Sequence, residues 1–169
     1  RLRFVVPLAA PHLRLQLTAA ITNSGIHPDT LQLWEGDPYT AMAAADAAIT
    51  KSGSVNVELA LMGVPQVVVY RIDELTAWIA RTVFTFNVKH ISLVNLILDR
   101  AAVPEFIQEA ATPEAVAAAV RELLPGGEGR VRLEMLTQYT HLKDALGAPG
   151  VADRAASYII KSARQGVTL

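Results

Sequence analysis

The sequence contains no cysteine, which excludes disulfide bridges and thiolate metal sites and is typical of a reducing compartment. Its 4 histidines are dispersed without a His-x-x-x-His pair, so we expect no metal site. An excess of charge is lacking too, because 15 basic residues face 16 acidic ones. This balance argues against a nucleic-acid partner bound through overall charge. No apolar run reaches the roughly 18–20 residues of a membrane-spanning helix.

The composition is that of a folded protein. Of the 169 residues, 51% are hydrophobic and 18% are charged, which is enough for a domain with a real core. The first segment, RLRFVVPLAAPHLRLQL, has the basic start of a signal sequence, but Pro7 and Pro11 interrupt its apolar part early. We interpret it as a buried strand followed by a helix. Because the chain begins abruptly at a strand and without methionine, we expect it to be a piece of a longer protein.

Short apolar runs alternate with segments of helical spacing along the chain. The runs predict strands at residues 2–9, 31–36, 46–52 and 65–71. The other segments predict helices at residues 11–24, 38–45, 54–62, 73–84, 113–124, 128–146 and 151–164. Residues 90–109 have no long period. Because each predicted strand is nearly all apolar, we expect an α/β fold in which helices cover both faces of a parallel sheet.

The tripeptide Ser52-Gly53-Ser54 follows a predicted strand and opens a predicted helix, the place where open α/β sheets bind ligands. Backbone N–H groups, two hydroxyls and the helix dipole could hold a phosphate there. The alternative is that Ser54 only caps the helix. The segment is no P-loop, because it lacks Gly-Lys-Ser/Thr, and its glycine spacing is not that of a dinucleotide fingerprint.

Glu58 lies one helical turn after Ser54 among apolar residues. A carboxylate in such a place needs a partner, and the two hydroxyls of a ribose are suitable donors. The alternative is a glutamate on the solvent side of the helix. Further polar candidates, each with a surface alternative, are Arg71, Ser92, Asn95, Arg100, Glu105 and Gln108. No Gly-x-Ser-x-Gly segment occurs, so serine hydrolysis is unsupported.

These residues belong to an ordered series of short segments. The series is Trp34-Glu35-Gly36, Met42 to Asp46, Ser52-Gly53-Ser54, Glu58, Gly63-Val64-Pro65, Tyr70-Arg71, Ile91 to Leu96, Arg100 and Glu105 to Gln108. In this order the segments closely resemble the carboxyl-terminal half of lipid-A-disaccharide synthase, most strongly over residues 31–125. The chain departs from that pattern at Lys51, at Ser54 (usually Thr), at Val94 (often Pro) and at Asp99 (often Gly). These departures indicate a divergent branch, so the family's acyl-chain and sugar specificity should not be carried over.

The resemblance implies one Rossmann-like half of a two-Rossmann (GT-B) glycosyltransferase. That family joins UDP-2,3-diacylglucosamine to 2,3-diacylglucosamine 1-phosphate with inversion, and UDP is the leaving group. The carboxyl-terminal half binds the UDP-sugar, while the other half holds the lipid acceptor and the general base. The implied enzyme needs no cofactor or metal and works in the cytoplasm at the surface of the inner membrane. The nucleotide-binding residues that it implies here are Gly36, Ser52, Gly53, Ser54, Glu58, Arg71, Ser92, Asn95, Arg100, Glu105 and Gln108.

Two units follow from this comparison: a nucleotide-sugar-binding domain at 1–125 and carboxyl-terminal helices at 126–169. Without the other half, we expect the chain to be inactive, and no catalytic residue is named in it. The alternatives are the donor half of another UDP-sugar glycosyltransferase or epimerase, and a non-catalytic nucleotide-binding or assembly fragment. The apolar stripes of the last two helices need a cover. They predict a tail that folds back on its own sheet or is buried against a second copy, and we favour a homodimer.

Overall fold

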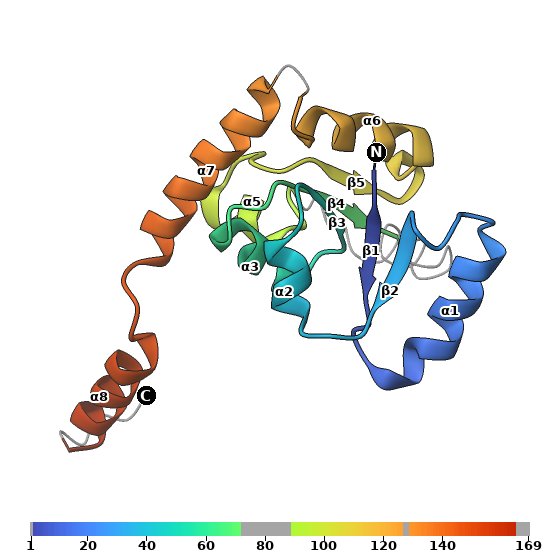
Figure 1. Cartoon of the computed structure of the whole chain (residues 1–169). Helices are drawn as coiled ribbons and strands as arrows, with labels where there is room; N and C mark the ends of the chain where they lie inside the picture. Colours follow the sequence, from blue (N-terminus) through green and yellow to red (C-terminus); the bar gives the residue numbers. More distant parts are fainter. Residues whose placement is uncertain (1, 72–88, 127–128, 165–169) are drawn as a thin grey trace, which may run out of the picture.

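The computed structural model describes residues 2–71, 89–126 and 129–164. In these ranges the strands are all parallel and helices flank them, which confirms the predicted α/β class (Figure 1). The strands β1 (Phe4–Pro7) and β2 (Leu31–Trp34) form one sheet. The strands β3 (Ala48–Thr50), β4 (Gln66–Tyr70) and β5 (Glu105–Ile107) form a second sheet in the order β3-β4-β5. The described strands therefore form two sheets where one was expected.

Helix starts follow the predicted capping signals. The helix α2 (Pro38–Ala43) begins after Asp37, whose carboxylate accepts the Thr40 N–H at 2.9 Å. The helix α6 (Pro113–Leu123) begins in the same way after Thr112. Proline occupies the first turn of both, where its missing N–H costs nothing. The first predicted helix is a 3₁₀ turn, η1 (Pro11–Leu13), that continues as α1 (Arg14–Asn23). The helix predicted at 73–84 lies outside the described residues.

The stretch 90–109, for which no element was predicted, contains three short ones. These are α5 (Leu93–Leu98), β5 and the 3₁₀ turn η2 (Gln108–Ala110). The strand β5 extends the second sheet, with Val69 opposite Phe106. It has three residues, too few for a period to appear in the sequence. This stretch therefore belongs to the sheet rather than to a surface loop.

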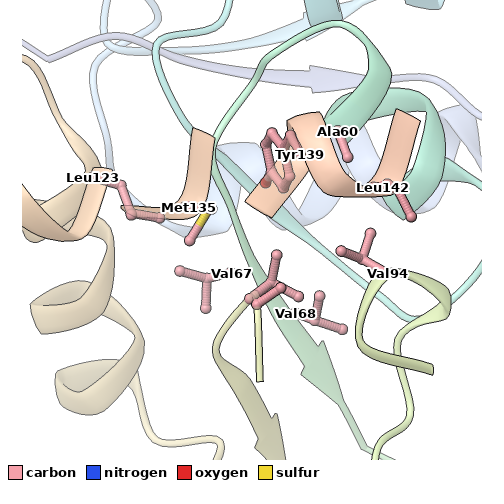
Figure 2. Packing of buried hydrophobic residues seen from close by; sticks show 10 residues of the cluster. Ala60, Val67, Val68, Val94, Leu123, Met135, Tyr139 and Leu142 are labelled. Atoms are coloured by element: carbon pink, nitrogen blue, oxygen red, sulfur yellow. The ribbon is translucent and has the colours of Figure 1, made fainter. Parts of the chain in front are cut away.

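The core lies around β4, between α3 (Val55–Leu61), α5, α6 and α7 (Arg130–Leu146). Figure 2 shows side chains of α7 and α6 pointing toward the valines of β4. The fully buried members of this cluster include Ala60, Val67, Val68, Val94, Leu123 and Leu142. The stripe predicted along residues 128–146 is therefore covered by the chain's own sheet at its centre, since Met135, Tyr139 and Leu142 are buried.

The last helix, α8 (Val151–Arg164), stands apart from both sheets (Figure 1). It has no buried residue, and Val151, Tyr158 and Ile159 are each at least 64% exposed. The tail was predicted either to fold back on its own sheet or to be buried against a second copy. The first alternative is true of α7 but not of α8. No helix in the described ranges combines the length and the apolar character needed to cross a membrane.

Candidate functional site

The loop 51–54 connects the carboxyl end of β3 to α3. The half-buried Ser52 donates its hydroxyl to the Ile91 carbonyl at 2.5 Å, which ties this loop to the segment before α5. Ser54 is exposed, and its side chain makes no hydrogen bond that caps α3. Within the described part of the chain, neither its N–H nor its hydroxyl has a partner. The capping alternative for Ser54 is therefore not what the structure has, and both groups can meet a ligand.

Glu105 holds the loop before α5 through hydrogen bonds. Its carboxylate accepts the Ser92 N–H at 2.8 Å, the Ile91 N–H at 3.0 Å and the Asn95 side-chain N–H at 2.8 Å. The structure thus brings Ser92, Asn95 and Glu105 together and joins them, through Ile91, to Ser52, which is far away in the sequence. A partly buried carboxylate needs hydrogen-bond partners, and three N–H groups supply them here.

The Asn95 amide is fully engaged in this arrangement. Its nitrogen also donates to the Val103 carbonyl, and its oxygen accepts the N–H groups of Ala102 and Val103 at 2.8 and 2.9 Å. Asn95 is 1% exposed and Ser92 is fully buried. Both side chains therefore shape the segment around the candidate site, and a direct contact with nucleotide remains a prediction for them.

Glu58 is half-buried on α3 and faces α2 rather than solvent alone. A hydrogen bond to Glu58, together with the charge of that carboxylate, raises the pKa of the Tyr39 hydroxyl. Tyr39 is also 52% exposed, so its ring is accessible. The neighbourhood of Glu58 thus offers a carboxylate beside accessible aromatic surface, which suits a nucleoside.

Gly36 lies under the Trp34 ring. A Cβ atom at this position would come within 2.7 Å of Trp34 Cζ2, so only glycine allows the ring to lie where it does. The indole N–H donates to the Asp37 carbonyl at 2.9 Å, which holds the ring there. The direct effect of Gly36 in the structure is therefore on the position of Trp34.

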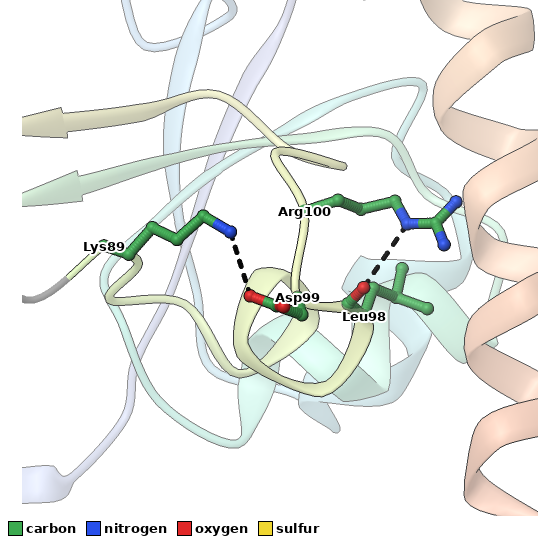
Figure 3. A network of polar contacts seen from close by, with 4 residues as sticks. All are labelled: Lys89, Leu98, Asp99 and Arg100. Atoms are coloured by element: carbon green, nitrogen blue, oxygen red, sulfur yellow. Dashed lines mark hydrogen bonds and ion pairs between the residues drawn. The ribbon is translucent and has the colours of Figure 1, made fainter.

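Arg71 follows β4, and Arg100 follows the end of α5. Arg71 is exposed just beyond β4. Arg100 donates its Nε–H to the Leu98 carbonyl at 3.3 Å and reaches Gln138 of α7 at 3.4 Å. Figure 3 shows that Arg100 points away from the neighbouring Lys89–Asp99 ion pair. Arg71 therefore lies at the carboxyl edge of the second sheet, from which the loop 51–54 also leaves, while Arg100 reaches α7.

Asp99 and Gln108 have left-handed backbone conformations. Asp99 has φ +49° where α5 ends, the conformation for which glycine is usual, and this explains the glycine of the resembling pattern. Asp tolerates it better than most residues. The Lys89 ammonium, 3.0 Å away, lowers the pKa of the Asp99 carboxyl. Gln108 has φ +51° directly after β5, so it holds backbone strain beside the sheet edge.

Three buried polar side chains were missed by the sequence reasoning: Asn56, Gln66 and His90. The first two are fully buried, and the His90 Nε2 has no partner within the described residues. The signal for Asn56 was a polar residue between two valines at the start of an apolar helix. In the described ranges, no group of three or more His, Asp and Glu side chains could hold a metal ion.

Comparison with known proteins agrees with the sequence resemblance. A family model described as lipid-A-disaccharide synthetase matches residues 1–154. The lipid-A-disaccharide synthase of Synechocystis sp. is 47% identical over 135 residues, which are 79% of this chain and 34% of that protein. The synthase of Gloeothece citriformis is 42% identical over 158 residues, which are 94% of this chain and 40% of that protein. That of Myxococcus xanthus is 38% identical over 161 residues, 95% of this chain and 40% of that protein.

The matches cover nearly all of this chain but less than half of each relative. The chain spans about two fifths or less of the length of these curated relatives. Identity of this level over most of the chain, together with the family model, confirms the resemblance. The chain belongs to the lipid-A-disaccharide synthetase family.

Proposed function

We propose that the chain is the donor-binding half of an inverting glycosyltransferase of lipid A synthesis. The donor would be UDP-2,3-diacylglucosamine and the acceptor 2,3-diacylglucosamine 1-phosphate. Family membership supports the reaction class. The observation that supports the place of the donor is Ser54, whose N–H and hydroxyl are both without partners in the described structure. They follow a parallel strand at its carboxyl end, where α/β sheets bind ligands.

In the proposed reaction, the main role of this half is to bind the leaving group. The acceptor hydroxyl attacks the anomeric carbon, and the bond to UDP breaks so that the diphosphate leaves with the electron pair. The N–H and the hydroxyl of Ser54 would donate hydrogen bonds to the charge that grows on the diphosphate, without a metal or cofactor. Glu58 would accept hydrogen bonds from the ribose hydroxyls.

We assign the general base, which takes the proton of the acceptor hydroxyl, to the part of the relatives outside the match. On its own, residues 1–169 would bind UDP but not transfer sugar. The lipid acceptor would likewise bind through that other part. Because both substrates carry acyl chains, the whole enzyme would work in the cytoplasm, peripheral to the inner membrane.

Calorimetric titration of the chain with UDP and ADP, each with and without a chelator, tests this proposal. We expect UDP to bind more tightly than ADP, and the chelator to leave the UDP affinity unchanged. Equal affinity for the two nucleotides would contradict a uridine-specific donor site. A strict requirement for a divalent cation would contradict the metal-free role of the loop 52–54.

A further inference from the structure

A buried network of amides and one phenol lies directly beneath the loop 51–54. Asn56 is at its centre: it is fully buried, as is Gln66 of β4, and Tyr139 of α7 is 2% exposed. Two consecutive elements, α3 and β4, and the distant helix α7 therefore contribute polar groups to one place in the core. Buried polar groups are costly unless they are paired, so their partners define what the network does.

Asn56 binds the loop through both ends of its amide. Its Oδ1 accepts the Gly53 N–H at 3.1 Å, and its Nδ2 donates to the Lys51 carbonyl at 3.1 Å. One side chain thus holds a backbone donor and a backbone acceptor on either side of Ser52. This fixes the course of the loop that carries Ser54.

Gln66 and, behind it, Tyr139 hold the Asn56 amide in place. Its second Nδ2 hydrogen points to Gln66 Oε1 at 3.2 Å, while Gln66 Nε2 donates to the Asn56 carbonyl at 2.8 Å and to the Tyr139 hydroxyl at 3.3 Å. Tyr139 donates its own hydrogen to the Val64 carbonyl at 3.2 Å. Both amide nitrogens use both of their hydrogens, so turning either amide over would set donors against donors. The orientation of Asn56 is therefore determined from α7.

We propose that Asn56 is a positioning residue of the donor site, and that Gln66 and Tyr139 make its position depend on α7. The inference rests on the proposed function, because it concerns how the loop that receives the diphosphate keeps its shape. The Gly53 N–H is occupied by Asn56 and does not bind the ligand. Ser54 supplies the free N–H and hydroxyl, and Asn56 fixes their orientation by holding the loop.

Asn56→Ala removes all contacts of the amide side chain, and Leu123→Ala is its matched control. Leu123 is fully buried in α6 and takes no part in the hydrogen bonds of the network, so its truncation lowers stability without removing any of those bonds. UDP affinity is measured by calorimetry at a temperature at which both variants are folded. We expect Asn56→Ala to weaken UDP about tenfold or more, as for a loss of several buried hydrogen bonds, and Leu123→Ala to leave it unchanged. Equal losses in the two variants, or none in Asn56→Ala, would overturn the proposal.

Tyr139→Phe separates positioning from general stability, because it removes one hydroxyl far along the network. We expect it to weaken UDP by about threefold in the natural background and not at all in the Asn56→Ala background, since coupled residues are not additive. Additive losses would show that Tyr139 does not act through Asn56.

Amide hydrogen exchange at Gly53 measures how firmly the loop is held when no ligand is bound. It should speed up at least about tenfold in Asn56→Ala and stay unchanged in Leu123→Ala. If the unaltered chain fails to bind UDP while the Gly53 amide behaves in this way, the proposed function fails and the positioning of the loop stands. Unchanged exchange at Gly53 in Asn56→Ala overturns the positioning itself.

Discussion

Replacing Glu58 by glutamine is the sharpest single change at the candidate site. The substitution is isosteric and removes one negative charge. Glu58 is half-buried and pairs with the Tyr39 hydroxyl, and the glutamine oxygen can still accept that hydrogen bond. The fold should therefore survive, while the ribose loses its charged acceptor.

The size of the effect follows from the chemistry of the lost contact. A hydrogen bond to a charged group contributes about 1.5–3 kcal/mol, against about 0.5–1.5 kcal/mol for a neutral pair. Glu58→Gln should therefore weaken UDP by about 1–3 kcal/mol, which is roughly 5- to 150-fold in Kd. Calorimetry gives the affinity, and thermal unfolding of the same samples gives the stability.

Glu122→Gln is the control, because Glu122 is an exposed carboxylate on α6, outside the candidate site. It should leave the UDP affinity as it is. If Glu58→Gln lowers the melting temperature sharply but binds UDP normally, Glu58 is a structural residue, and its assignment to the ribose is refuted.

Three further outcomes follow from the structure. Burial raises the pKa of Tyr139 to about 12, above the ordinary value of 10.0, so the folded chain keeps a proton that the unfolded chain loses. This group should lower the free energy of unfolding by about 2 kcal/mol as pH rises from 10 to 12, and Tyr139→Phe should remove that part of the loss in urea unfolding. Asp99 has φ +49°, so Asp99→Ala should be about 1 kcal/mol less stable than Asp99→Gly; equal melting of the two would contradict strain at this position. The exposed stripe of α8 predicts a homodimer in sedimentation at micromolar concentration, which Ile159→Glu should convert to monomer; a monomeric unaltered chain with ordered 128–164 would refute this.

Much of the fold could be predicted because its signals are local. Asp37-Pro38 and Thr112-Pro113 each place a capping side chain and a fixed φ at a helix start, and both helices begin there. The stripe Met135, Tyr139 and Leu142 repeats at helical spacing, and it is buried as one face. These features depend on neighbours within a few residues, which the sequence displays directly.

The features that could not be predicted depend on contacts between distant residues. Asn95 was named as a nucleotide-binding residue because of the family resemblance. In the structure its amide joins Ala102, Val103 and Glu105, and no local pattern indicates these partners. The same holds for Asn56, which is linked to Tyr139 only through Gln66. Gln66 and Tyr139 are 73 positions apart, so no local pattern connects them. The strand β5 was missed because three residues show no period.

A structure of the chain with UDP bound tests the central claim most directly. The account predicts the β-phosphate within hydrogen-bond distance, about 3 Å, of the Ser54 N–H and hydroxyl, with the ribose hydroxyls on the Glu58 carboxylate. The Gly53 N–H should remain on Asn56 Oδ1. A diphosphate bound away from the loop 52–54, or held there only through a metal ion, would contradict it.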